Sequence, residues 1–379
     1  MTTLGSGHMS TVVTPAFLSA TAMVVRTVDP AYSGTQVVRG HLFVNVVSPL
    51  ATDGIYLQIN GHESASWSAL ARDRSKGDKK RVTVHHHENS REIFNVRAPI
   101  HLADDVLQPG HYLFPFEFEL PRNVPGSFAD DRAPTHPDIT DAGQYRARVS
   151  YAMTAEMVVR PDNPDDDYAV IRATCDLIVK GRPLASIATV KRDCNAAIRT
   201  WCCLNKGSVF LRVRFAQKAY QSGTTADLIV EFNNSSTVDV EHIKVELYRS
   251  LQMHGTTARY CRIDRVRVQV ADGVQAGDDR MGDNALRIPL SLTDDDGKPL
   301  TPTTLGRVVV CRYWIEVFVP VPCGSGDIEA RLPVTVIVPH CTPAEWAVNP
   351  LLGWDPVVSR IVNLDVEEDG SSRTYLIDA

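Results

Sequence analysis

The segment Leu107–Phe128, LQPGHYLFPFEFELPRNVPGSF, constrains the fold of this chain more than any other. It begins with a Pro-Gly turn, after which one set of apolar side chains recurs at every second position: Phe114, Phe116, Phe118 and Leu120. A period of two with one wholly apolar face predicts a half-buried β-strand, because successive side chains of a strand point to opposite faces. Pro115 has no N–H to donate, so we expect a strand edge or an interruption of the ladder there.

Short stretches with the same alternation recur along the chain, separated by turn residues. They include residues 42–47 and 55–60 in the first half and 209–215, 243–248 and 313–319 in the second. We find no convincing long amphipathic helix. Many short alternating strands with turn signals between them predict an all-β fold of sandwiches or barrels.

The length of 379 residues favours two domains, and 44% hydrophobic residues suffice for a core in each. The turn AYSGT precedes the strand LFVNV and the turn AYQSGT precedes DLIVEF, and we match the two turns at their glycines, Gly34 and Gly223. This internal repeat favours a tandem of like sandwiches. We expect an N-terminal domain over residues 1–181, a C-terminal domain over 182–345 and an acidic tail over 346–379, with residues 181–200 crossing between the domains. The Pro- and Asp-rich residues 129–141 are expected to form a surface loop.

Charge and cysteine usage narrow the class of protein. The net charge of −6 gives no reason to expect nucleic acid as a partner. All eight cysteines lie from Cys175 onward, which favours reduced structural thiols in a cytosolic protein over a disulfide-stapled secreted one. The mildly apolar residues 12–25 follow no basic residue and contain Pro15, so we interpret them as a lead into a strand, not as a signal peptide. No apolar run is long enough to cross a bilayer.

Few residues carry a recognisable chemistry. No nucleotide-binding glycine fingerprint, nucleophile elbow or metalloprotease helix motif is present. On a strand, His85 and His87 would share a face and offer two metal ligands, but only Glu88 lies nearby as a third. The alternative is a solvated strand end. We therefore expect no catalytic residue, no cofactor and no metal site.

One loop is strongly basic. Six cations lie within ten residues: Arg72, Arg74, Lys76, Lys79, Lys80 and Arg81. They form a candidate site for phospholipid head groups of an anionic membrane surface or for a phosphorylated tail. The alternative is a mobile, solvated loop without a ligand.

Several of these segments resemble a known family. The order Phe114-Pro115-Phe116, Leu120-Pro121, Pro125-x-Ser127-Phe128 is similar to the signature strand of the arrestin N-domain, especially in α-arrestins, and Tyr145–Val149 lies where that family resumes with a tyrosine-led strand. Residues 220–249, YQSGTTADLIVEFNNSSTVDVEHIKVELYR, resemble the arrestin C-domain, and the Cys202-Cys203 pair before them is similar to α-arrestins. The resemblance implies the arrestin fold, two tandem immunoglobulin-like β-sandwiches.

The resemblance also implies a function. It is that of a non-enzymatic cytosolic adaptor or scaffold that links membrane-protein cargo tails to endocytic sorting, ubiquitination or signalling machinery, peripherally at the plasma membrane or endosomes. The Pro-Pro-x-Tyr motif through which α-arrestins recruit ubiquitin ligases is absent from this sequence, so that role is not carried over. One alternative is a retromer-type arrestin-like subunit of a stable trafficking coat. A second is a metal-dependent enzyme that uses the His85–His87 run.

Two further features of the family concern phosphate sensing and clathrin binding. Receptor-type arrestins carry a paired-lysine phosphate sensor near the N-terminus, which this sequence lacks, and Arg172 is a candidate for their buried arginine. In the tail, a loose apolar-apolar-x-apolar-acid pattern resembles a clathrin-binding box, formed by Ile361, Val362, Leu364 and Asp365. The alternative for these tail residues is a further strand or a packed tail.

Overall fold

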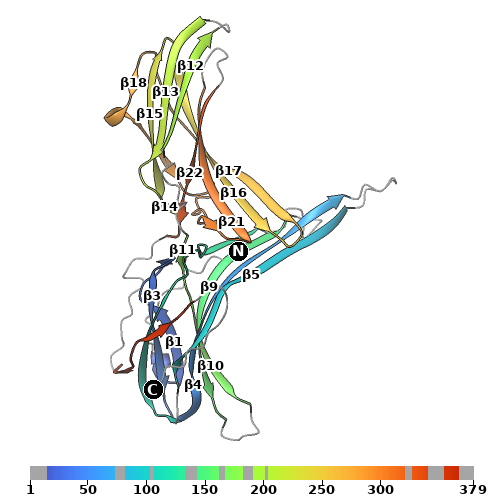
Figure 1. Cartoon of the computed structure of the whole chain (residues 1–379), viewed down its shortest axis with the longest axis vertical. Coiled ribbons are helices and arrows are strands. Elements are labelled where there is room, and N and C mark those ends of the chain that lie inside the picture. The colour runs from blue at the N-terminus through green and yellow to red at the C-terminus, as the bar shows by residue number, and fades with distance from the viewer. Residues whose placement is uncertain are drawn as a thin grey trace.

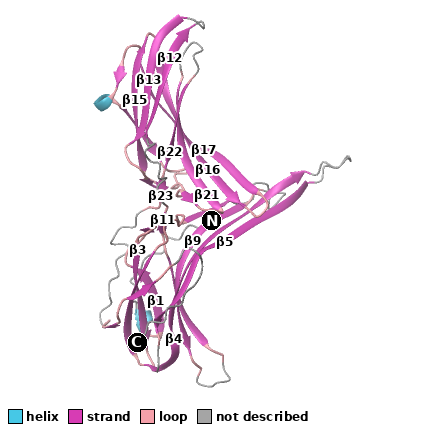
Figure 2. Cartoon of the chain, viewed as in Figure 1, coloured by secondary structure: helices cyan, strands magenta, loops and turns pink. Residues whose placement is uncertain are grey.

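The computed structural model describes residues 15–72, 82–102, 106–132, 143–161, 167–181, 191–200, 204–320, 327–339 and 354–366. Two β-sandwich domains lie end to end along the long axis of the molecule (Figure 1). Strands dominate the described part (Figure 2), where the helical elements are the short α1, Pro15–Leu18, and the 3₁₀ turn η2, Gly282–Asn284. The predicted all-β tandem is confirmed.

Two large sheets and the short parallel pair β2–β11 form the described part of the N-terminal domain. One has the order β1-β3-β7, and the other has the order β10-β9-β4-β5 with β8 beside β9. The strands are β1 Ala22–Thr27, β2 Tyr32–Ser33, β3 Val37–Val46, β4 Leu50–Arg72, β5 Val82–His101, β6 Val106–Leu107, β7 Gly110–Glu119, β8 Phe128–Arg132, β9 Tyr145–Val159, β10 Ala169–Asp176 and β11 Val179–Lys180.

The C-terminal domain repeats this plan. One sheet has the order β12-β13-β15, with β18 and β19 beside β15, and the other has the order β17-β16-β21, with β20 and β22 beside β21. The strands are β12 Lys191–Thr200, β13 Leu204–Phe215, β14 Tyr220–Gln221, β15 Thr225–Ser236, β16 Val240–His254, β17 Arg259–Val274, β18 Asp279–Arg280, β19 Leu286–Ser291, β20 Thr304–Leu305, β21 Val309–Val319, β22 Ile328–Val334 and β23 Val336–Ile337.

The signature segment forms β7 with the predicted alternation. Phe114, Phe116 and Phe118 are at most 4% exposed and face the space between the sheets, whereas Glu119 is exposed. Burying this row of phenylalanine side chains contributes to the hydrophobic stabilisation of the domain. The position of β7 in its sheet is therefore fixed by the apolar face that the sequence alternation defines.

The internal repeat is also present in the structure, as a tyrosine hydroxyl that closes a loop in each domain. In the first domain the Tyr32 hydroxyl accepts a hydrogen bond from the N–H three residues earlier at 2.8 Å and donates to the C=O seven residues later at 3.2 Å. The Tyr220 hydroxyl makes the same two bonds, at 3.0 and 3.2 Å. The tyrosines, not the neighbouring glycines, are thus the equivalent positions, and Thr35 (φ 69°) stands where the second domain has Gly223 (φ 81°).

Two expectations about loops need correction. Residues 129–132 are not part of a surface loop, because they belong to β8 and pair with β9. The crossing between the domains does not extend to Thr200, because β12 begins at Lys191 and pairs with β13. Both segments are strands because partner strands distant in the sequence pair with them, which local composition does not reveal.

The β4–β5 hairpin is much longer than the sandwich needs. Its outer part projects from the N-terminal domain beside the β16–β17 hairpin of the other domain (Figure 1). Residues 73–81, which connect the two strands and hold most of the basic loop, lie outside the described residues, as does the side chain of Arg72.

Candidate functional site

The outer edge of β7 binds an extended segment from the far end of the chain. β24 (Val357–Val358) pairs in parallel with Tyr112 and Leu113, and β25 (Val362–Leu364) pairs in parallel with residues 116–118. The two short ladders leave out Pro115, the position where the sequence predicted an interruption. Since proline offers no N–H, a strand added to this edge must break there. We call residues 354–366 the tail segment.

Aromatic side chains hold the beginning of the tail segment. The Trp354 ring stacks on His111 with centroids 4.6 Å apart and contacts Phe17 at 5.7 Å and Phe43 at 6.1 Å. Phe17 and Phe43 form a small apolar cluster apart from the main core. Aromatic contacts of this kind stabilise a local structure beyond the area they bury. This cluster fixes the beginning of the tail segment to the surface of the first domain.

Leu364 anchors the other end of the tail segment in the core of the first domain. It is 5% exposed and belongs to the main hydrophobic core, whereas Ile361 is 61% exposed. The clathrin-box-like residues are therefore not equally accessible, because one of their apolar side chains lies in the core. The alternative that the sequence left open, a further strand, is what the structure shows. Clathrin binding through Ile361, Val362, Leu364 and Asp365 stays a prediction and requires release of β25 from β7.

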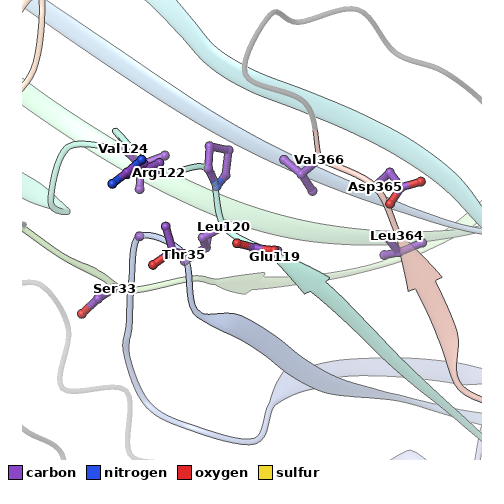
Figure 3. Close-up of a pocket in the computed structure, with 11 residues that line it drawn as sticks. Ser33, Thr35, Glu119, Leu120, Arg122, Val124, Leu364, Asp365 and Val366 are labelled. Carbon is purple, nitrogen blue, oxygen red and sulfur yellow. The ribbon is translucent and has the colours of Figure 1, made fainter.

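A pocket of about 800 Å³ lies where the tail segment leaves β7. Figure 3 shows the Ser33–Thr35 turn and the chain that follows β7 on one side, and residues 364–366 on the other. Its apolar wall includes Leu120 and Val124. Its charged lining is the carboxylates of Glu119 and Asp365 and the guanidinium of Arg122. Such a mixture suits a peptide that continues beyond β25 and shows no nucleophile–base pair that would indicate catalysis.

The interface between the domains contains a buried carboxylate. Glu63 of β4 is fully buried and accepts backbone N–H bonds from Arg307 (3.2 Å), Val308 (2.8 Å) and Val309 (2.7 Å) of the second domain. A Cβ at Gly306 would lie 1.7 Å from the Glu63 carboxylate, so only glycine permits this approach. Successive backbone N–H groups that converge on one oxyanion stabilise it without a cation. Glu63 thus joins the two domains through main-chain atoms.

A buried ion pair lies in the same interface. Arg249 of β16 pairs with Asp130 of β8, and the two side chains are 16% and 15% exposed. The Tyr145 hydroxyl donates to Asp130 at 3.1 Å, and burial beside this carboxylate raises the pKa of Tyr145. Burial likewise raises the pKa of the neighbouring Cys311 thiol, so it stays protonated. Because the composition of residues 129–141 indicates a surface loop, this ion pair was not predicted from the sequence.

Further contacts complete the interface. The Trp67 ring lies 6.1 Å from Tyr260, and the Asn89 amide donates to the C=O of His254 at 2.8 Å. The Thr304 hydroxyl donates to the C=O of Gly126 at 2.8 Å. Contacts of several kinds hold the domains together, and they involve β4, β5 and β8 of the first domain and β16, β17, β20 and β21 of the second.

The other candidate site residues from the sequence, Arg172 and the His85–His87 run, lie away from the β7 edge. Arg172 is not the buried arginine that the sequence suggested: its side chain is 64% exposed and pairs with Glu156 at 2.8 Å. His85 and His87 lie on the projecting part of β5, where His87 contacts Trp67 at 5.3 Å between ring centroids. Among the described residues no three His, Cys, Asp or Glu side chains gather as metal ligands. In the described part, no helix is both long and apolar enough to cross a membrane.

Comparison with known proteins agrees with this architecture. Residues 23–175 match the family model of the arrestin (or S-antigen) N-terminal domain, and residues 205–341 match that of the arrestin (or S-antigen) C-terminal domain. Both matches fall within the two sandwiches described above.

Curated relatives match over most of the chain. Arrestin domain-containing protein A of Dictyostelium discoideum is 24% identical over 318 residues, which cover 82% of this chain and 50% of that protein. Arrestin domain-containing protein 4 of Mus musculus is 24% identical over 315 residues, and that of Homo sapiens is 23% identical over 313. These two matches cover 80% of this chain and 68% of each relative. The chain thus spans about half the length of the first relative.

Proposed function

The chain belongs to the arrestin family, and on that premise we propose that it is a non-enzymatic adaptor that links membrane-protein cargo to trafficking machinery. In this proposal an extended segment of a cargo tail binds along β7 of the first domain. The adaptor works in the cytoplasm, at the plasma membrane or endosomes.

One observation carries the proposal: the outer edge of β7 already pairs with a chain segment that is distant in the sequence. Edge strands present unpaired N–H and C=O groups, and an added extended peptide satisfies them. Main-chain pairing depends little on peptide sequence, so the same edge suits different cargo segments. The tail segment occupies this edge in the chain itself and would compete with cargo.

Side chains of β7 and its neighbours add selectivity. The buried position of Leu364 supports one apolar anchor in the cargo peptide, and the aromatic cluster around Phe17 and Phe43 supports a second. The pocket at the end of β25 would receive the residues of the cargo peptide that follow its apolar anchor. A peptide with two apolar anchors around a break opposite Pro115 is the pattern we propose for cargo.

In this proposal two further sites connect the adaptor to the membrane and to the trafficking machinery. The basic loop Arg72–Arg81, which lies between β4 and β5 in the sequence, would contact phosphate groups of an anionic membrane. A released tail segment would present its clathrin-box-like residues, so cargo binding and coat recruitment would be linked through one strand. Recruitment of a ubiquitin ligase would need a separate partner protein.

The edge can be tested directly with a labelled peptide of residues 354–366. We expect it to bind the Leu364→Asp variant, whose own tail segment is expelled because a charge in the core is unfavourable. The unaltered chain and the Ile361→Asp variant should bind it weakly, because residue 361 is exposed and the tail stays in place. Equal binding by all three proteins would contradict the proposed edge.

The cellular role needs a second experiment. Tagged full-length chain is compared in a pull-down with Leu364→Asp and with a chain cut after Thr342. We expect both altered proteins to retain more membrane-protein cargo and the cut chain to lose coat proteins. A single fixed partner set that survives every change would instead favour a constitutive coat subunit.

A further inference from the structure

The second domain contains a pocket that the proposed function does not use. It has a volume of about 510 Å³ and lies between the first residues of β12 and the strands β21 and β22. Its lining consists of Arg192, Arg312, Arg331, Glu329, Tyr313, Trp314 and Pro333. We call it the arginine pocket.

The charges in the arginine pocket do not balance. Three guanidinium groups line it and Glu329 is the one carboxylate among its lining residues. Within the described residues neither Arg192 nor Arg312 makes an ion pair, whereas Arg212 on the next strand binds two carboxylates. Like charges at the wall of one concave site repel each other, and an anion between them removes that repulsion.

Arg331 is held in place before any ligand binds. Its guanidinium lies 4.3 Å from the centroid of the Trp314 ring, and its Nε lies 3.7 Å from the Glu316 carboxylate. The Trp314 ring is itself fixed, because it stacks on Tyr248 at 5.5 Å and its Nε1 donates to Glu316 at 3.0 Å. The Arg331 side chain is nevertheless 61% exposed. An arginine that is already ordered loses little conformational entropy when it binds a carboxylate.

The two strands beside the pocket are edge strands. Among the described residues β12 pairs only with β13, and β22 pairs only with β21. The Cys194 thiol donates to the C=O of Glu329 at 3.4 Å and holds the two edges near each other. An edge strand offers backbone N–H and C=O groups that an extended peptide can pair with. A lipid head group has no such backbone.

We propose that the arginine pocket binds an acidic peptide segment of a partner protein in an extended conformation. A glutamate or aspartate side chain of the partner lies between Arg192, Arg312 and Arg331, where planar guanidinium forks bind carboxylate oxygens in pairs. The backbone of the segment bonds to the edge strands. This site lies in the other domain from the β7 edge and is independent of it.

The test uses purified full-length chain and a fluorescein-labelled peptide of alternating glutamate and valine, followed by fluorescence anisotropy. We expect this peptide to bind and the matching lysine–valine peptide not to bind. The double variant Arg192→Gln/Arg312→Gln should weaken binding by about tenfold or more, since each charge-assisted bond contributes substantially. Arg312→Lys keeps the charge but loses the fork, so it should give an intermediate affinity. Arg287→Gln, at an exposed arginine of β19, is the matched control and should have no effect.

Several results would overturn the proposal. One is equal affinity of the double variant and the unaltered chain for the acidic peptide. Another is inorganic phosphate alone binding as tightly as the peptide, which would indicate a small-anion site. A third is arginine-dependent binding to phosphatidylserine vesicles without peptide binding, which would indicate a membrane site. Leu364→Asp should leave the acidic-peptide affinity unchanged, so failure at the β7 edge is distinguishable from failure here.

Discussion

The Glu63 carboxylate of the first domain accepts the backbone N–H of Val309 of the second at 2.7 Å, in an environment where Glu63 is fully buried. A buried charge is unfavourable unless every oxygen is satisfied. Here the donors belong to the other domain, so any rotation that separates Glu63 from Val309 would leave the buried carboxylate without its hydrogen-bond donors. The relative orientation of the two sandwiches therefore depends on this contact.

Replacing Glu63 with glutamine should destabilise the protein by about 2 kcal/mol, because the new NH₂ group faces N–H donors and leaves them unsatisfied. Calorimetry would measure this as a lower transition temperature. The control is Glu88→Gln on the exposed face of β5, which should change stability by less than about 0.5 kcal/mol. If the two variants lowered the transition temperature equally, the hydrogen bonds of Glu63 across the interface would not stabilise the protein as proposed.

Asp130 and Arg249 should be strongly coupled. Either Asp130→Asn or Arg249→Met alone leaves a buried charge without its partner, at a cost of about 3 kcal/mol. The double variant should lose clearly less than the sum, because both charges are then gone. Urea denaturation of the four proteins gives the coupling free energy. Additive losses would mean that the two groups do not interact in solution.

Stability should fall at alkaline pH through tyrosines. The hydrogen bond to Glu246, with burial, raises the pKa of Tyr248 to about 12 from its ordinary 10.0. Burial also raises the pKa of Tyr145, Tyr151 and Tyr313. The unfolded chain loses these protons first. The contribution of Tyr248 to stability is therefore complete below pH 10 and is lost as pH rises through 12.

Unfolding free energies measured across this pH range, together with tyrosinate absorbance, would test the expectation. The buried tyrosines should ionise only as the protein unfolds. A Tyr248→Phe variant should show a shallower loss above pH 10, because one of the shifted groups is absent. A stability that stayed level from pH 10 to 12 would contradict the assignment.

Trp354 should control opening of the tail segment. Trp354→Ala removes the contacts with His111, Phe17 and Phe43, so amide hydrogen exchange in β24 should become about tenfold faster or more. Exchange in β25 should change less, because Leu364 still anchors it in the core. Ile361→Ala, at an exposed position of the same segment, is the control. Unchanged exchange in β24 would show that main-chain pairing alone holds it.

Part of the candidate site was accessible from the sequence. The alternation of Phe114, Phe116 and Phe118 identified β7, and Pro115 predicted the break in the ladder at its outer edge. Both inferences depend on neighbours within a few residues. The pattern at Ile361–Asp365 left a strand as an alternative, but nothing in it indicated β7 as the partner. The basic loop Arg72–Arg81 stays a prediction, since it lies outside the described residues.

The sequence by itself determined the all-β class, the tandem of two sandwiches and the buried face of strands such as β7, because side-chain periodicity and turn residues act locally. Only the tertiary structure decided which distant groups meet. Glu63 and Val309, Asp130 and Arg249, and the three arginines of the arginine pocket are brought together by strand order and domain packing. A carboxylate on an alternating strand has the same local pattern whether it faces water or another domain, so its partner follows from topology alone.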